Sequence, residues 1–163
     1  MSLAIVLIAA SGCGDDDVAE PDPDERLVEI YAATIEAVVA EASTLPAEGD
    51  DPMFVYVGER HDVKINADVQ LGVVVELEGW ATIRFIDEQN EGIDTDDPEM
   101  PVRGEGMLVG LGPVPDGEAS VVVYADRYES ESSTVVYDVA LHRRGGIWEV
   151  ETPLEGTEVD AAP

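Results

Sequence analysis

The chain has 163 residues, of which 37 are Asp or Glu and only 8 are Lys or Arg, so its formal net charge at pH 7 is −29. A surface this acidic repels nucleic acid and anionic lipid headgroups, which excludes both as partners. Cys13 is the single cysteine, so no internal disulfide can form and the fold must be stabilised by burial. The length after Cys13 suffices for one hydrophobic core.

The N-terminal segment predicts export and lipid attachment. Its apolar run, residues 3–10, is far shorter than the roughly 20 residues that span a bilayer, but it fits the apolar region of a signal peptide. The following Ala10-Ser11-Gly12-Cys13 resembles a lipobox, the cleavage site of bacterial lipoproteins. The resemblance implies a signal peptide over residues 1–12, a diacylated Cys13, and a lipid anchor on the extracytoplasmic face of the cell membrane. No Lys or Arg precedes Leu3, which predicts a natural start upstream of Met1.

The residues after Cys13 predict a tether and then a helix. Residues 13–24 are acidic and contain prolines, so we expect an extended, self-repelling segment. From Glu25 to Ala42 the apolar residues recur at intervals of three and four, which predicts a helix with one apolar face. Asp24 is expected to cap this helix, and Pro46 to end the segment.

A crossover unit is predicted next. Residues 53–57 are a short apolar run typical of a buried strand, and residues 80–86 are also strand-like. Between them, residues 67–78 follow Asn66 with the spacing of a helix, although the valines at 73–75 favour a strand. If this segment is a helix, the two flanking strands run parallel.

The remainder of the chain predicts a loop followed by a meander of strands. Residues 88–102 have no apolar periodicity and are interpreted as an exposed acidic loop. Four β-rich segments follow, at residues 106–111, 119–128, 134–143 and 147–151. Within the third, Tyr137 and its apolar neighbours at alternate positions are expected on one face and Asp138 on the other. The last hairpin should turn through Gly145 and Gly146, and the acidic residues 153–163 should fray.

These elements predict a single α+β domain over residues 25–152. We expect one long N-terminal helix and a second, shorter helix, packed on a mostly antiparallel sheet of about five or six strands. The order of lipobox, acidic tether, long helix and final hairpin resembles small exported lipoproteins of high-GC Gram-positive bacteria. The resemblance implies a location and an architecture, and it transfers no catalytic residue.

Motifs with specific chemistry are few. The glycines from Gly104 to Gly112 are spaced faintly like a dinucleotide loop, but they lead into Pro113 and not into a helix. A strand whose glycines meet another backbone or a large aromatic ring is therefore favoured. His61 and His142 are the only imidazoles, so a two-histidine metal site would need both, and exposed positions are favoured for each. No cofactor is expected.

Two charged groups remain as candidate sites. The acidic loop could offer hard oxygens to Ca²⁺ at Asp94, Asp96, Asp97 and Glu99, but it lacks the order of an EF-hand, so weak counter-ion attraction is favoured. The one basic spot could contact an acidic partner through His142, Arg143 and Arg144. Balancing of nearby carboxylates within the hairpin is the favoured interpretation.

The function predicted from these observations is a membrane-anchored extracytoplasmic lipoprotein that acts as a non-catalytic binding or envelope-accessory module. Its partner would be an envelope protein or a small ligand. One alternative is an enzyme with a pocket between helix and sheet that uses His142 or a carboxylate. A second alternative is a Ca²⁺-responsive surface protein that acts through residues 94–99.

Overall fold

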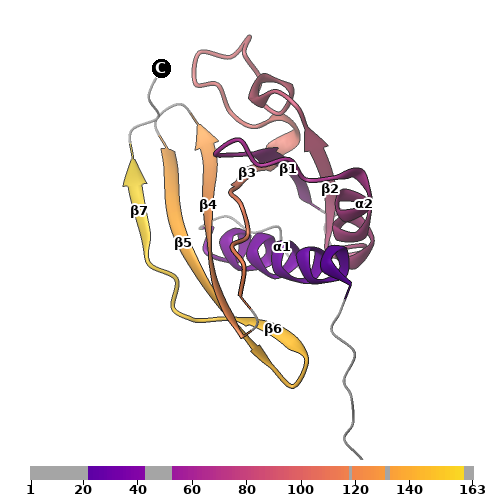
Figure 1. Cartoon of the computed structure of the whole chain (residues 1–163). Coiled ribbons are helices and arrows are strands. Elements are labelled where there is room, and N and C mark those ends of the chain that lie inside the picture. Colours follow the sequence, from indigo (N-terminus) through magenta and orange to yellow (C-terminus); the bar gives the residue numbers. More distant parts are fainter. Residues whose placement is uncertain (1–21, 43–52, 118, 131–132, 160–163) are drawn as a thin grey trace, which may run out of the picture.

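The computed structural model describes residues 22–42, 53–117, 119–130 and 133–159, which form an α+β fold with two helices and a curled mixed sheet (Figure 1). The helices are α1 (Pro23–Ala40) and α2 (Ala67–Glu76), with short 3₁₀ turns η1 (Gln89–Glu91) and η2 (Arg103–Glu105). The strands are β1 (Met53–Glu59), β2 (Ala81–Ile86), β3 (Met107–Leu111), β4 (Ser120–Ser130), β5 (Ser133–Arg144), β6 (Ile147–Val150) and β7 (Gly156–Val159). The predicted fold class, with a long first helix and a shorter second one, is confirmed.

The sheet combines a parallel and an antiparallel part. Its order is β2-β1-β3-β4-β5-β6, and β7 also pairs with β5. Strand β1 runs parallel to both β2 and β3, whereas every later pairing is antiparallel. The predicted parallel crossover is therefore confirmed, with α2 connecting β1 to β2.

Helix α1 begins two residues earlier than the sequence pattern predicts. Asp22, not Asp24, is the N-cap, because its side chain accepts a hydrogen bond of 2.9 Å from the backbone N–H of Asp24. Pro23 occupies the first turn, where its missing N–H costs nothing. The predicted apolar stripe is confirmed: Ile30, Ile35 and Val38 are fully buried against the sheet.

The C-terminal end of α1 is held by a buried arginine from the sheet. The last carbonyls of a helix lack partners within it, and α1 has no basic residue in its last turn. Arg127 of β4 supplies the cation: its Nη1 donates to the carbonyl oxygen of Val38 at 2.8 Å. The guanidinium also lies 5.7 Å from the ring centroid of Tyr137 on β5. This contact offsets the partial negative charge of the helix end and joins α1 to two strands.

Helix α2 forms in the segment whose sequence pattern is compatible with either a helix or a strand. The Asn66 side chain accepts from the backbone N–H of Val69 at 2.9 Å and so caps the first turn. Val69 and Val73, four residues apart, are buried on one face. Gly72 lies against Val28 of α1 so closely that a Cβ atom would overlap it. Capping and close helix packing thus outweigh the strand preference of the valines.

The loop at residues 88–102 is more structured than predicted. Ile93 and Val102 are buried and form an isolated antiparallel bridge. They belong to a second apolar cluster, together with Tyr56, Ile86, Leu108 and Tyr128. The Tyr128 hydroxyl donates to the Met100 carbonyl at 2.8 Å. The interpretation as a wholly exposed loop was wrong, because its two isolated apolar residues anchor it to the sheet.

The C-terminal half otherwise follows the predicted meander. In β5, Tyr137, Val139 and Leu141 are buried while Asp138 is exposed, as predicted. Gly145 and Gly146 both have positive φ and form the expected turn between β5 and β6. The predicted fraying does not extend to residues 156–159, which form β7 against β5. Within the described part of the chain, no helix is both long and apolar enough to cross a membrane.

We expect Arg127→Met to lower the free energy of unfolding by about 1–3 kcal/mol, because the Val38 carbonyl would stay buried without its cationic donor. The measurement is urea unfolding followed by circular dichroism. Arg84→Met, at an exposed position of β2, is the matched control and should change the free energy by less than about 0.5 kcal/mol. Equal midpoints for the two variants would contradict the capping role.

A second prediction concerns pH. Burial raises the pKa of Glu29, outweighing the lowering by Arg143, and its Oε2 has no hydrogen-bond partner among the described residues. A raised carboxyl pKa favours the protonated form in the folded state, so its stabilising contribution is complete below about pH 4.5 and is lost as pH rises through the raised pKa. Glu29→Gln should therefore raise the melting temperature by about 1–3 °C at pH 7 and by less at pH 4. Scanning calorimetry at both pH values tests this, with Glu78→Gln at an exposed position as the control. An equal change in the melting temperature of Glu29→Gln at pH 4 and pH 7 would refute the prediction.

Candidate functional site

The candidate site lies on the outer face of the sheet, defined here as the face opposite α1. In β4, Val121, Val123 and Ala125 point into the core cluster that contains α1. The alternating residues Val122 and Tyr124 therefore lie on the outer face, opposite Ala140 and Asp138 of β5. Two hollows open beside this face, one around Tyr124 and one beside His142.

An ion pair on the outer face fixes the segment that follows β1. The Arg60 Nε and Nη2 donate to the two carboxylate oxygens of Asp126 at 2.7 and 3.1 Å, a bidentate arrangement. The Asp126 side chain is only 8% exposed and that of Arg60 24% exposed. Gly110 of β3 lies close beside the pair, and a Cβ atom there would overlap both side chains. The expectation that a glycine of this segment meets another backbone is confirmed at Gly106, where a Cβ atom would overlap the Phe54 carbonyl, whereas the neighbour of Gly110 is this ion pair.

Arg60 also begins a tight turn that places His61 against an aromatic ring. His61 and Asp62 both have positive φ, and the backbone N–H of Val63 donates to the Arg60 carbonyl at 3.2 Å. Asp and His are among the residues that best tolerate this left-handed conformation. The His61 ring meets the Tyr124 ring edge-on, with centroids 4.3 Å apart. His61 is exposed, as predicted.

These two rings line an open hollow of about 340 Å³. It is lined by His61, Pro113, Pro115, Val122, Tyr124 and Asp138. Burial raises the pKa of Tyr124, and the carboxylate of Asp126 raises it further; Arg60 lowers it by less, and Asp138 adds the smallest increase. The phenol is therefore neutral at physiological pH. The hollow combines apolar walls, two aromatic rings and one carboxylate.

The proline wall of the hollow is held from α1. The Tyr31 hydroxyl donates to the Gly112 carbonyl at 3.2 Å, and burial raises the pKa of Tyr31 to about 12. Arg26 donates to the carbonyls of Pro115 and Gly117 at 3.0 and 2.9 Å. Helix α1 thus positions residues 112–117 by contacts to the backbone.

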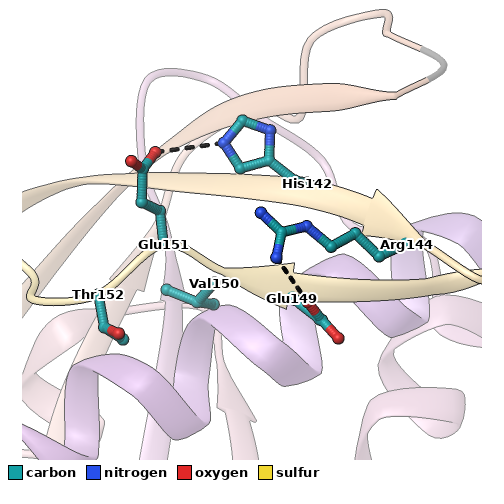
Figure 2. A pocket seen from close by; sticks show the side chains of 6 residues that line it. All are labelled: His142, Arg144, Glu149, Val150, Glu151 and Thr152. Atoms are coloured by element: carbon teal, nitrogen blue, oxygen red, sulfur yellow. Dashed lines mark hydrogen bonds and ion pairs between the residues drawn. The ribbon is translucent and has the colours of Figure 1, made fainter.

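The predicted basic spot is divided between two faces. His142 lies 3.2 Å from Glu151, and Arg144 lies 3.7 Å from Glu149, beside a hollow of about 260 Å³ also lined by Val150 and Thr152 (Figure 2). Arg143 lies between them in the strand and on the opposite face, where its charge acts on Glu29 and its Nε donates to Gly146. The three residues therefore do not form one basic surface. Glutamates balance the two on the outer face.

The position of His142 also bears on the enzyme alternative. His142 follows fully buried Leu141 and points to the face of β5 away from α1. A pocket between α1 and the sheet could not use it. The two histidines are not brought together either: His61 contacts Tyr124, while His142 pairs with Ser120, four residues earlier in β4 and so roughly 13 Å away.

The acidic loop directs its carboxylates to its own backbone. The Asp94 side chain accepts from the N–H of Asp96 at 3.2 Å, and the Asp97 side chain accepts from the N–H of Glu99 at 2.9 Å. Among the residues that the structure describes, no three His, Cys, Asp or Glu side chains converge to hold a metal ion. Cys13, the predicted lipidation site, lies outside the described residues.

Sequence reasoning missed the hollow around Tyr124 and the Arg60–Asp126 pair. Arg60 and Asp126 are 66 residues apart, and nothing in the spacing links them. A usable signal was the scarcity of cations: an arginine directly after a buried strand, in so acidic a chain, is a good candidate for an internal ion pair. The hollow itself depends on four separate segments and has no local pattern.

We expect Asp126→Asn to lower the free energy of unfolding by about 1–3 kcal/mol, because the Arg60 guanidinium would lose its charge partner in a half-buried position. Urea unfolding measures the effect, and exposed Asp87→Asn is the matched control. Gly110→Ala should destabilise the fold independently, since its Cβ would displace the pair. Unchanged stability in both Asp126→Asn and Gly110→Ala would show that the pair has no structural role.

The chain was compared with known proteins at the level of family, sequence and structure. No protein-family model matches it, and neither a curated protein nor a solved structure is significantly similar to it. The resemblance to exported lipoproteins therefore stays a prediction, and the function must be argued from the residues themselves.

Proposed function

We propose that the chain is a lipid-anchored extracytoplasmic protein whose domain binds a ligand or an envelope partner through the outer face of its sheet. The observation that carries the proposal is the sequence Ala10-Ser11-Gly12-Cys13 directly after a short apolar run. Small residues before a cysteine suit a lipoprotein signal peptidase, and a diacylated Cys13 would hold the mature chain at the membrane. A single acyl chain binds membranes only marginally, whereas two give a stable anchor.

The distance from the anchor to the domain supports this arrangement. Helix α1 begins at Pro23, ten residues after Cys13. Ten residues reach at most about 33–36 Å when fully extended. The domain would thus stay close to the membrane while its acidic surface is repelled by anionic headgroups. An acidic segment that contains prolines would stay extended, and so would keep the acidic domain away from the headgroups while the lipid holds the chain at the membrane.

The packing of the domain favours binding over catalysis. Ile30, Val55 and Val109 are fully buried between α1 and the sheet, at the place where the enzyme alternative needs a pocket. On the outer face, by contrast, the hollow around Tyr124 is open to solvent and has apolar walls. Such a surface can hold a ligand, but it leaves the ligand open to water. A closed active site, by contrast, expels water from around the reacting groups.

The Ca²⁺ alternative has weaker support. The Asp94 and Asp97 carboxylates already accept backbone hydrogen bonds, and no metal-binding group was found in the described part of the chain. Ca²⁺ takes six to eight oxygen ligands, several of them from protein carboxylates and carbonyls. We therefore place the function at the outer face and not in the acidic loop.

The test of the anchor is the intact mass of the protein extracted from membranes of a bacterial host. We expect the wild type to lack residues 1–12 and to carry the mass of attached acyl chains on Cys13. Cys13→Ser should be neither acylated nor cleaved at this position, and Ser11→Ala, which keeps a small residue before the cysteine, should behave as the wild type does.

The opposite result would require a different location for the protein. A wild-type chain whose mass equals that of its full, unmodified sequence would be neither cleaved nor acylated, and this result would overturn the proposal. Fractionation gives a second reading, because an acylated chain should partition into the detergent phase. The signal peptide itself could also retain the chain at the membrane, so the mass and not the fraction is decisive.

A further inference from the structure

We propose that the hollow around Tyr124 binds a small organic cation, with an ammonium group carried on a short apolar body. This inference rests on the proposed binding function and names its ligand class. The hollow brings together the turn after β1, the segment after β3, and the outer faces of β4 and β5. Each of these contributes a different part of the recognition.

The size and walls of the hollow suit a small apolar body. Its volume of about 340 Å³ falls at the lower end of the range of small-molecule sites. Pro113 and Pro115 form a stiff wall, and Val122 of β4 is 53% exposed although its neighbours in the strand are buried. A ligand that covers this valine and the prolines would remove apolar surface from water.

The charge of the hollow selects a cation. Asp138 lies directly opposite Tyr124 in the sheet, and none of the described residues forms a hydrogen bond or an ion pair with its carboxylate. The other carboxylate nearby, Asp126, is already engaged by Arg60. One carboxylate without a charge partner, beside the ring of Tyr124, is a suitable receptor for an ammonium group, through charge and cation–π attraction.

Other ligand classes fit less well. An anion would meet the Asp138 carboxylate and the field of a chain with net charge −29. A metal ion would need several converging ligands, and no such group was found among the described residues. A neutral apolar molecule would gain nothing from the charge of the Asp138 carboxylate.

The hollow is also organised before any ligand arrives. The Arg60–Asp126 pair fixes the turn that carries His61, and contacts from Tyr31 and Arg26 hold the proline wall. A site whose walls are already in place loses little conformational entropy on binding. The arrangement therefore suits recognition of a small ligand without a large rearrangement.

The experiment is an NMR titration of the ¹⁵N-labelled full chain in a non-ionic detergent with n-butylammonium. n-Butanol and butyrate are the neutral and anionic comparators. About 1 M NaCl reduces the Debye length to about 3 Å and so suppresses diffuse attraction to the acidic surface. We expect saturable shifts of the Tyr124, Val122 and Asp138 amides with butylammonium, and none with butanol or butyrate.

Two variants and two matched controls locate the site. Asp138→Asn should weaken butylammonium binding about five- to tenfold, because the charge partner is lost. Val122→Arg should abolish it, since the new guanidinium would occupy the hollow. Asp68→Asn and Ile147→Arg make the same charge changes at exposed positions elsewhere and should leave the dissociation constant within about twofold.

Three outcomes would overturn the inference. The first is a set of amide shifts that do not saturate. The second is binding of butanol or butyrate as tight as that of butylammonium. The third is butylammonium binding by Val122→Arg as tight as that by the wild type. The ¹⁵N spectrum of each variant reports its folding in the same experiment. Failure here is separate from failure of the membrane anchor, because the anchor is read from the mass of Cys13 and the ligand site from the amides of β4 and β5.

Discussion

Burial of the apolar stripe of α1 against one face of the sheet is the constraint on which the rest of this structure depends. A fully buried Ile or Val contributes about 1.5–3 kcal/mol, and α1 alone provides four that are completely covered: Ile30, Ile35, Val38 and Val39. No disulfide can assist, since the chain has one cysteine. With one face of the sheet committed to α1, strand alternation assigns every other side chain to the outer face. The site is a consequence of that assignment.

The few cations of the chain hold this arrangement together. Arg127 caps the C-terminal end of α1, Arg60 pairs with Asp126 on the outer face, and Arg26 holds the segment after β3 by its carbonyls. Arg103 similarly donates to the Ile93 carbonyl within the acidic loop. The carboxylates are mostly exposed to water, where self-repulsion is screened. Four of the eight cations thus hold segments of the fold to one another, and the negative charges lie mostly at its surface.

Much of the architecture followed from local patterns, and its departures have physical reasons. The long helix, the crossover through α2 and the Gly145–Gly146 hairpin each depend on short-range periodicity or turn chemistry, which the sequence displays directly. The start of α1 was missed because Asp22 and Asp24 are both plausible caps, and the choice depends on Pro23. The burial of Ile93 and Val102 was missed because two isolated apolar residues in an acidic loop have no period.

The sequence by itself determined the elements, their apolar faces, the acidic surface and the segment at Cys13 that predicts a destination, because each is encoded within a few neighbouring residues. Only the tertiary structure decided what meets on the outer face. His61, Tyr124 and Asp138 come from three separate segments, and Arg143 is separated from His142 and Arg144 although the three are adjacent in the chain. The reason is the pleat of the strand. It sends neighbours in sequence to opposite faces and brings residues from different strands together.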